Sequence, residues 1–89
     1  MKSTVSPRFW KHYKALPQKI QRQADKTYRI WRINPNAHSL YFKRLHTRSP
    51  IFSVRIGRGY RALGIVNENA IIWFWIGTHD EYERLLKQL

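Results

Sequence analysis

The chain has 89 residues, of which 43% are hydrophobic and 15% aromatic, so we expect one small domain with a single core over residues 1–89. It has no cysteine, which excludes disulfide bonds and thiolate metal sites and fits a reducing, cytoplasmic location. The longest apolar run, residues 70–76, is too short to cross a bilayer, and the first residues lack the apolar stretch of a signal peptide. We therefore expect no membrane association.

Positive charge is concentrated in the first three quarters of the chain. The formal net charge is +12, and residues 1–67 hold 15 of the 17 lysines and arginines but only one of the five acidic residues, Asp25. A field of this sign attracts RNA, DNA or an acidic protein partner. The alternative is a generally basic surface that is simply exposed to solvent and has no specific partner.

Two helices are predicted at the start of the chain. Ser6 can cap a helix that begins at Pro7, where the missing N–H of proline costs nothing. Apolar residues then recur at helical spacing: Phe9, Trp10, Tyr13 and Leu16. Pro17 interrupts this helix and can open a second one, which ends at Asn34. The second helix of this hairpin carries a basic stripe, either a solvated face or an RNA contact: Lys19, Arg22, Lys26 and Arg29.

The pattern then becomes strand-like. Four strands are predicted, over residues 40–45, 51–56, 60–66 and 70–76. The strand 51–56 alternates, so Val54 should face the core with its apolar neighbours, while Ser53 and Arg55 should face outward. The strand 70–76 does not alternate, which is typical of a central strand covered on both faces.

A short amphipathic helix is predicted over residues 80–89, with Thr78 as a possible cap. The complete order, α-α-β-β-β-β-α, predicts an α+β domain. All its helices, the N-terminal helical hairpin and the short C-terminal helix, should pack on one face of a mostly antiparallel sheet of three to four strands. The opposite face should carry the outward arginines.

The connection between the second and third predicted strands holds three arginines within seven residues: Arg55, Arg58 and Arg61. Gly57 and Gly59 allow the backbone to turn between them. Guanidinium groups gathered this closely repel one another unless an anion lies nearby, and their planar donors suit phosphate oxygens. The turn therefore points to nucleic acid.

These segments resemble the RelE/ParE superfamily of bacterial toxins from type II toxin–antitoxin systems. The matching passages, which follow the helical hairpin, are FKRL at 42–45, SVRIGRGYRALG at 53–64 and WIGTHDEY at 75–82. The resemblance implies an acidic antitoxin as partner and no cofactor. RelE-like members are ribosome-dependent mRNA endonucleases, whereas ParE-like members inhibit DNA gyrase.

The resemblance also implies site residues. The catalytic positions of the nuclease branch match four residues of this chain: Arg55, Arg61, His79 and Tyr82. Three further cations would contact RNA phosphates: Arg58, Lys43 and Arg44. Ser53 stands where the best-known nucleases have a proton-transferring lysine, and residues 1–5 are too short and polar to predict the family's N-terminal strand.

The chemistry of RNA cleavage suits these residues, because the 2′-OH of RNA can attack the adjacent phosphate without a metal ion. Histidine is the side-chain type best suited to proton transfer near neutral pH, so His79 can act as acid or base, and Tyr82 could share that role. Arg55 and Arg61 would stabilise the charge on the phosphate. The structural alternatives are a partly buried Arg61, a His79 that only begins a helix, and a Tyr82 that packs with the leucines after it.

Three functions therefore remain open from the sequence. The first is a metal-independent, ribosome-associated mRNA endonuclease, with mRNA and the ribosome as partners. The second is a ParE-like toxin that inhibits DNA gyrase. The third is a catalytically inactive RNA-binding member of the family.

Overall fold

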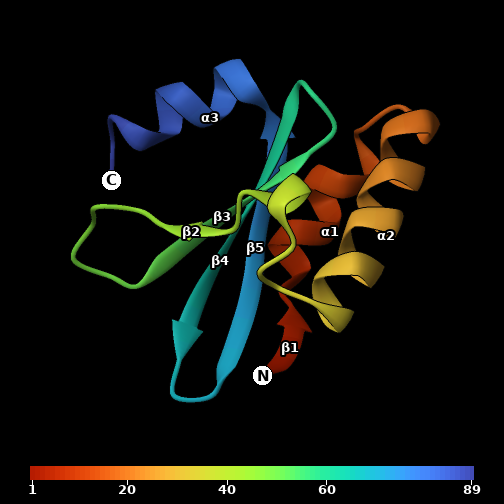
Figure 1. The fold of residues 1–89 in the computed structure, drawn as a ribbon. Helices are drawn as coiled ribbons and strands as arrows, with labels where there is room; N and C mark the ends of the chain where they lie inside the picture. Colours follow the sequence, from red (N-terminus) through yellow and green to blue (C-terminus); the bar gives the residue numbers. More distant parts are fainter.

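The computed structural model describes residues 1–89 as a five-stranded sheet with helices on both faces (Figure 1). The elements, in chain order, are β1 (Lys2–Val5), α1 (Pro7–Lys14), α2 (Gln18–Ile33), the 3₁₀ helix η1 (His38–Leu40), β2 (Lys43–Arg44), β3 (Ile51–Ile56), β4 (Tyr60–Asn67), β5 (Ala70–Thr78) and α3 (His79–Leu86). The sheet order is β1-β5-β4-β3-β2. The predicted α+β class and the helical hairpin are confirmed.

The sheet has one strand more than the sequence predicted. β1 pairs in parallel with β5, with Lys2 opposite Ala70 and Val5 opposite Trp73. The chain then turns directly into α1, and the Ser6 N–H still donates to the Trp73 carbonyl at 2.9 Å. Four residues are too few to show a strand periodicity in the sequence. The strand forms because β5 offers it a free edge.

The helical hairpin covers one face of the sheet. Ser6 caps α1 by accepting a hydrogen bond from the Phe9 N–H at 3.3 Å, with Pro7 in the first turn, as predicted. Both helices contribute apolar side chains to a core whose buried members are Ala24, Trp31, Leu40, Val54, Ile56, Ala62, Ile71, Trp73 and Ile76. We refer to these nine residues as the first core.

The C-terminal helix lies on the other face, so the prediction that all helices share one face is wrong. α3 lies across the sheet from α1 and α2 (Figure 1). It covers a second core, made of Leu45, Ile51, Leu63, Trp75 and Tyr82. Ser53 points to this side and is fully buried, rather than outward as predicted, because α3 and the β2–β3 connection cover the strand.

A bulge in β5, opposite Leu63 and Gly64, places the two tryptophans of this strand in different cores. Trp73 pairs with Gly64 and Trp75 pairs with Leu63, so Phe74 is the extra residue. Trp73 then belongs to the first core and Trp75 to the second. A side chain on Gly64 would lie 2.8 Å from the Ile71 side chain, which explains the glycine. Both faces of β5 are covered, as its unbroken apolar run predicted.

None of the helices combines the length and the apolar character that a membrane span requires.

Candidate functional site

The site is built on the hairpin of β3 and β4. Arg55 and Arg61 are directly opposite each other in the strand register, on the sheet face that α3 partly covers. Like charges at such positions destabilise a sheet, because their β-carbons lie only about 4.5–5.5 Å apart. The pair is therefore a place where an anion would stabilise the fold.

The surroundings of the two arginines leave donors free for that anion. The Arg55 Nε–H donates to the Gly57 carbonyl at 2.8 Å, which leaves its two terminal amino groups without a protein acceptor. Arg61 lies with its Cζ 5.5 Å from the ring centroid of Tyr82, and its Nη1 is buried without any hydrogen-bond partner. A buried guanidinium donor without a protein acceptor is rare in a folded protein.

The turn between the strands connects the arginines to α3. Gly57 has a φ of +57°, which only glycine adopts without strain, and Arg58 is exposed at the tip. The His79 N–H donates to the Gly59 carbonyl at 2.8 Å. This bond fixes His79, the first residue of α3, against the turn. The backbone of His79 therefore lies beside the hairpin of β3 and β4 that carries the arginines.

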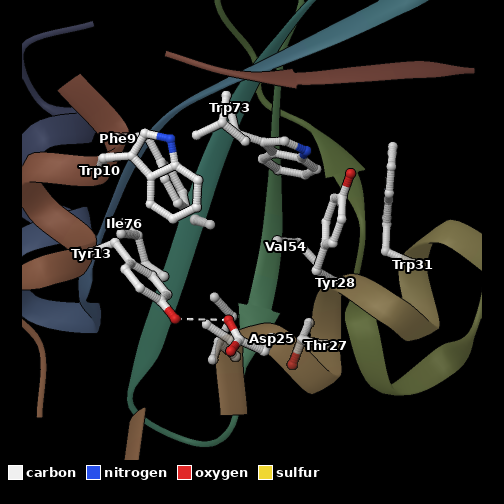
Figure 2. Close-up of a pocket in the computed structure, with 14 residues that line it drawn as sticks. Phe9, Trp10, Tyr13, Asp25, Thr27, Tyr28, Trp31, Val54, Trp73 and Ile76 are labelled. Carbon is white, nitrogen blue, oxygen red and sulfur yellow. Dashed lines mark hydrogen bonds between the residues drawn. The ribbon is translucent and has the colours of Figure 1, made fainter. Parts of the chain in front are cut away.

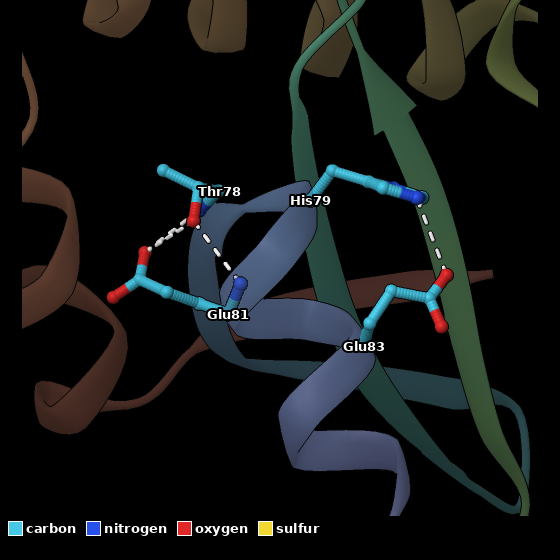
Figure 3. Close-up of polar contacts among 4 residues, drawn as sticks. All are labelled: Thr78, His79, Glu81 and Glu83. Atoms are coloured by element: carbon cyan, nitrogen blue, oxygen red, sulfur yellow. Dashed lines mark hydrogen bonds and ion pairs between the residues drawn. The ribbon is translucent and has the colours of Figure 1, made fainter.

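His79 is held by its own helix. Thr78 caps α3 and forms a capping box with Glu81, and the hydrogen bonds from Thr78 hold the pKa of Glu81 below its ordinary value (Figure 3). The His79 Nε2 lies 3.2 Å from Glu83 Oε1 one helical turn later, and the His79 side chain is 44% exposed. The imidazole therefore has a carboxylate beside its Nε2, and the side chain as a whole is accessible to solvent. Glu83 was not predicted as a site residue, although its spacing of four residues from His79 could have indicated it.

Tyr82 is only 4% exposed and belongs to the second core. Its ring centroid lies 5.8 Å from the His79 ring and 5.5 Å from the Arg61 Cζ. The structure thus brings three of the four expected catalytic residues together around this ring, and Arg55 joins them through its register with Arg61.

The two cations of β2 separate onto different faces. Lys43 is opposite Ser53, so it shares the face of Arg55, whereas Arg44 is opposite Phe52 on the first-core side. Both residues are exposed. The register therefore adds Lys43, but not Arg44, to the arginine side of the sheet. No cluster of three or more metal-ligating side chains is present.

The opposite face of the sheet holds an apolar groove. A cavity of about 200 Å³ opens between α1 and α2 above the strands, and 12 of its 14 lining residues are hydrophobic (Figure 2). At one end the Tyr13 hydroxyl donates to Asp25 at 2.9 Å. Burial and this carboxylate together raise the pKa of Tyr13. Trp10 and Tyr28, from the two helices, leave 45% and 37% of their surface exposed at this groove.

Solved structures of similar fold come from toxin–antitoxin systems. The RelB–RelE antitoxin–toxin complex of Methanococcus jannaschii matches with a TM-score of 0.74 and 17% identity, over 92% of this chain and 96% of that chain. The RelE–RelB complex of Pyrococcus horikoshii matches at 0.67 and 18%, over 86% and 92%. The YoeB dimer of Staphylococcus aureus matches at 0.68 and 19%, over 89% and 97%. These matches show the fold.

The family follows from the sequence. No curated protein matches the chain at a significant level. The family model described as "ParE-like toxin domain", however, matches residues 18–84, which include α2, the whole β3–β4 hairpin, β5 and most of α3. The chain therefore belongs to the ParE-like toxin domain family and is a toxin of a type II toxin–antitoxin system.

Proposed function

We propose that the chain is a metal-independent endonuclease that cleaves mRNA on the ribosome. The observation that carries the proposal is the Arg55–Arg61 pair, with the unpartnered Nη1 of Arg61, beside a histidine that is paired with a carboxylate. Phosphate is the anion that fits two neighbouring guanidinium groups, and histidine is the side chain best suited to move protons at neutral pH. Together they supply the two requirements of RNA cleavage.

Each residue has a separate role in the proposed reaction. The 2′-oxygen attacks the adjacent phosphorus, the bond to the 5′-oxygen breaks, and the RNA is left with a cyclic phosphate and a free 5′-OH. His79 Nδ1 takes the proton from the 2′-OH, while Glu83 accepts the Nε2–H and stabilises the imidazolium. Arg55 and Arg61 stabilise the added negative charge on the phosphate oxygens. The departing oxygen takes its proton from water in the open site.

Tyr82 has a positioning role in this proposal. Its burial favours a ring that supports Arg61 and His79 over a phenol that exchanges protons with solvent. Lys43 lies on the same side of the sheet as the arginine pair, and the exposed Arg58 lies in the turn between β3 and β4. Both would bind phosphates that flank the cleaved one. Arg44, on the other face, would contact RNA farther along its path.

The second candidate function is inhibition of DNA gyrase. It is favoured by the family match, whose description is ParE-like, and by Ser53, which stands where the nucleases that the sequence resembles have lysine. Ser53 is fully buried and its hydroxyl has no hydrogen-bond partner, so it offers no proton to a substrate. An inactive RNA-binding member would keep the arginine pair and lack the reaction.

Two assays on the purified wild-type chain separate these functions. We expect ribosomes programmed with a defined mRNA to yield new 5′ ends, mapped by primer extension, and the same mRNA without ribosomes to remain intact. Gyrase supercoiling should proceed normally in the presence of the chain. Intact mRNA together with blocked supercoiling would establish the gyrase inhibitor instead, and neither effect would indicate the inactive member.

We further propose that an acidic antitoxin segment, folding on binding, places an amphipathic helix in the groove between α1 and α2. The groove supplies an apolar floor for the helix. The outer face of α2, away from the groove lining, carries four exposed basic residues that would bind acidic residues of the antitoxin chain beyond that helix: Lys19, Arg22, Lys26 and Arg29. The RelE chains with which this fold is shared were solved in complexes with RelB. An occupant with an apolar helix face and an adjoining acidic stretch fits both features.

A helix in this groove predicts a difference between two substitutions that each add one negative charge. Thr27→Glu places a carboxylate in the groove lining and should weaken antitoxin binding at least about tenfold, which corresponds to about 1.4 kcal/mol. Gln88→Glu adds its charge at an exposed position after α3, away from α2 and the groove, and should bind normally. Titration calorimetry with the product of the neighbouring gene measures both. Equal affinities would rule out the groove.

A further inference from the structure

Tyr41 has an unusual backbone conformation next to the arginine pair. It follows η1 with φ 46° and ψ 42°, in the left-handed region, where a bulky side chain is uncommon. Glycine or asparagine would occupy this position with less strain. Such outliers persist where a particular side chain is needed and cluster at functional sites. The tyrosine side chain is nevertheless 55% exposed, so core packing does not explain it.

The Tyr41 ring is in direct contact with the site. The Arg55 Cζ lies 5.1 Å from its ring centroid, a cation–π contact. The Arg55 Nε–H donates to the Gly57 carbonyl, which leaves the two terminal amino groups for the proposed phosphate. The Arg55 guanidinium would therefore lie between the Tyr41 ring and that phosphate. An exposed aromatic ring thus lies in direct contact with Arg55, one member of the arginine pair.

Residues 35–38, 41 and 42 line a hollow next to Tyr41. Tyr41 lines it together with Asn36 and His38, and it has a volume of about 240 Å³. The Asn36 N–H is bonded to the Asn34 side-chain oxygen at 3.1 Å, which orders the loop. The side chains of Asn36 and His38 form no hydrogen bond with the rest of the protein. The hollow therefore combines an aromatic wall with polar groups that can pair with a planar ligand.

We propose that Tyr41 is the stacking platform of a nucleobase subsite for an unpaired base of single-stranded RNA. Proteins recognise single-stranded RNA by stacking its splayed bases on aromatic side chains and by hydrogen bonds to the base edges. Here the base stacks on Tyr41, Asn36 and His38 contact its edge, and the adjoining phosphate reaches Arg55. The inference rests on the proposed function for the identity of that phosphate, and the subsite would select which nucleotide neighbours the cleaved bond.

The test measures binding rather than cleavage. The probe is a fluorescent single-stranded RNA hexamer with 2′-O-methyl groups, which cannot be cut, and anisotropy is measured at low salt. Tyr41→Ala should weaken binding about 5- to 150-fold, the effect of losing one stacked base. Tyr41→Phe should bind like the wild type, because the ring is retained. Circular dichroism melts establish that each variant is folded.

The chain supplies a matched control. Tyr28 is also an exposed tyrosine under an arginine, with the Arg32 Cζ 5.9 Å from its ring centroid, but it lies at the groove of the opposite face. Tyr28→Ala should leave RNA affinity unchanged. Hexamers with one abasic position give a second readout: removal of the stacked base should weaken binding to the wild type and have no effect on Tyr41→Ala.

The outcomes separate this subsite from the nuclease itself. A chain that cuts no mRNA but shows the Tyr41-dependent abasic effect keeps the subsite and loses the proposed function. Active cleavage with unchanged hexamer binding by Tyr41→Ala overturns the subsite alone. Binding by Tyr41→Phe as weak as that of Tyr41→Ala, or an equal loss in Tyr28→Ala, also overturns it, since stacking would then not be the interaction measured.

Discussion

His79→Gln is expected to lower the rate of ribosome-dependent mRNA cleavage by about 10²–10⁴-fold, the usual contribution of a general acid or base. Glutamine keeps much of the side-chain volume and can still contact Glu83, so the variant should remain folded. The loss should appear in the rate of the chemical step under single-turnover conditions rather than in binding to the ribosome. Toxicity on expression should disappear with it.

Arg61→Ala is the companion variant, because it removes the guanidinium whose Nη1 has no partner in the protein. Relief of the repulsion with Arg55 should leave the fold intact, while cleavage falls through lost stabilisation of the phosphate charge. His46→Gln is the control for both, since His46 is exposed in the loop between β2 and β3. Full cleavage by folded His79→Gln would exclude His79 as the proton-transfer group and direct attention to Tyr82.

The difference between predicted and observed fold comes from elements whose sequence signal is non-local. The helical hairpin and the strands 51–56, 60–66 and 70–76 are confirmed, because capping residues, spacing and turn glycines are local features. β1 was missed because its only partner, β5, lies about seventy residues away in the sequence. The side chosen by α3 depends on where the chain leaves β5 after the bulge at Leu63 and Gly64, which no local pattern reveals.

The candidate site divides in the same way. The Arg55–Arg61 pair follows from the hairpin, since a turn over residues 57–59 sets the two arginines opposite each other. The packing of Tyr82 with the leucines after it was one of the two alternatives that the sequence left open. The burial of Ser53 could not be predicted once α3 was expected on the other face of the sheet. Tyr41 carries no signal in the sequence, because its left-handed backbone arises from the end of η1.

The two faces of the sheet have different characters, which bears on how a toxin can be silenced. The groove between α1 and α2 is apolar, whereas the arginine pair and His79 lie on the α3 side. A partner helix in the groove would leave the proposed catalytic residues uncovered. An antitoxin that blocks RNA directly must therefore also pass around an edge of the sheet, and the shortest edge strand, β2, brings Lys43 there as an anchor for acidic residues.

Trp73→Ala is expected to destabilise the fold by about 3–5 kcal/mol, the usual effect of truncating a large aromatic residue in a core. Trp73 is 4% exposed, its ring lies 5.3 Å from the Trp31 ring in an edge-to-face contact, and its Nε1–H donates to the Ser3 Oγ at 3.1 Å. The substitution therefore leaves a cavity under the helical hairpin and removes a tie to β1. A domain of this size should lose about 4–8 °C of melting temperature for each kcal/mol.

Trp10→Ala, in helix α1 of the hairpin that covers the first core, is the matched control. Trp10 is 45% exposed at the groove, so its removal should lower the melting temperature much less than removal of Trp73, as measured by circular dichroism. The predicted loss for Trp73→Ala is a large part of the 5–15 kcal/mol that stabilises an ordinary domain, so its cleavage activity should decline with the unfolded fraction as temperature rises. His79→Gln should instead be inactive while fully folded. Equal melting temperatures for Trp10→Ala and Trp73→Ala would contradict the placement of Trp73 at the centre of the first core.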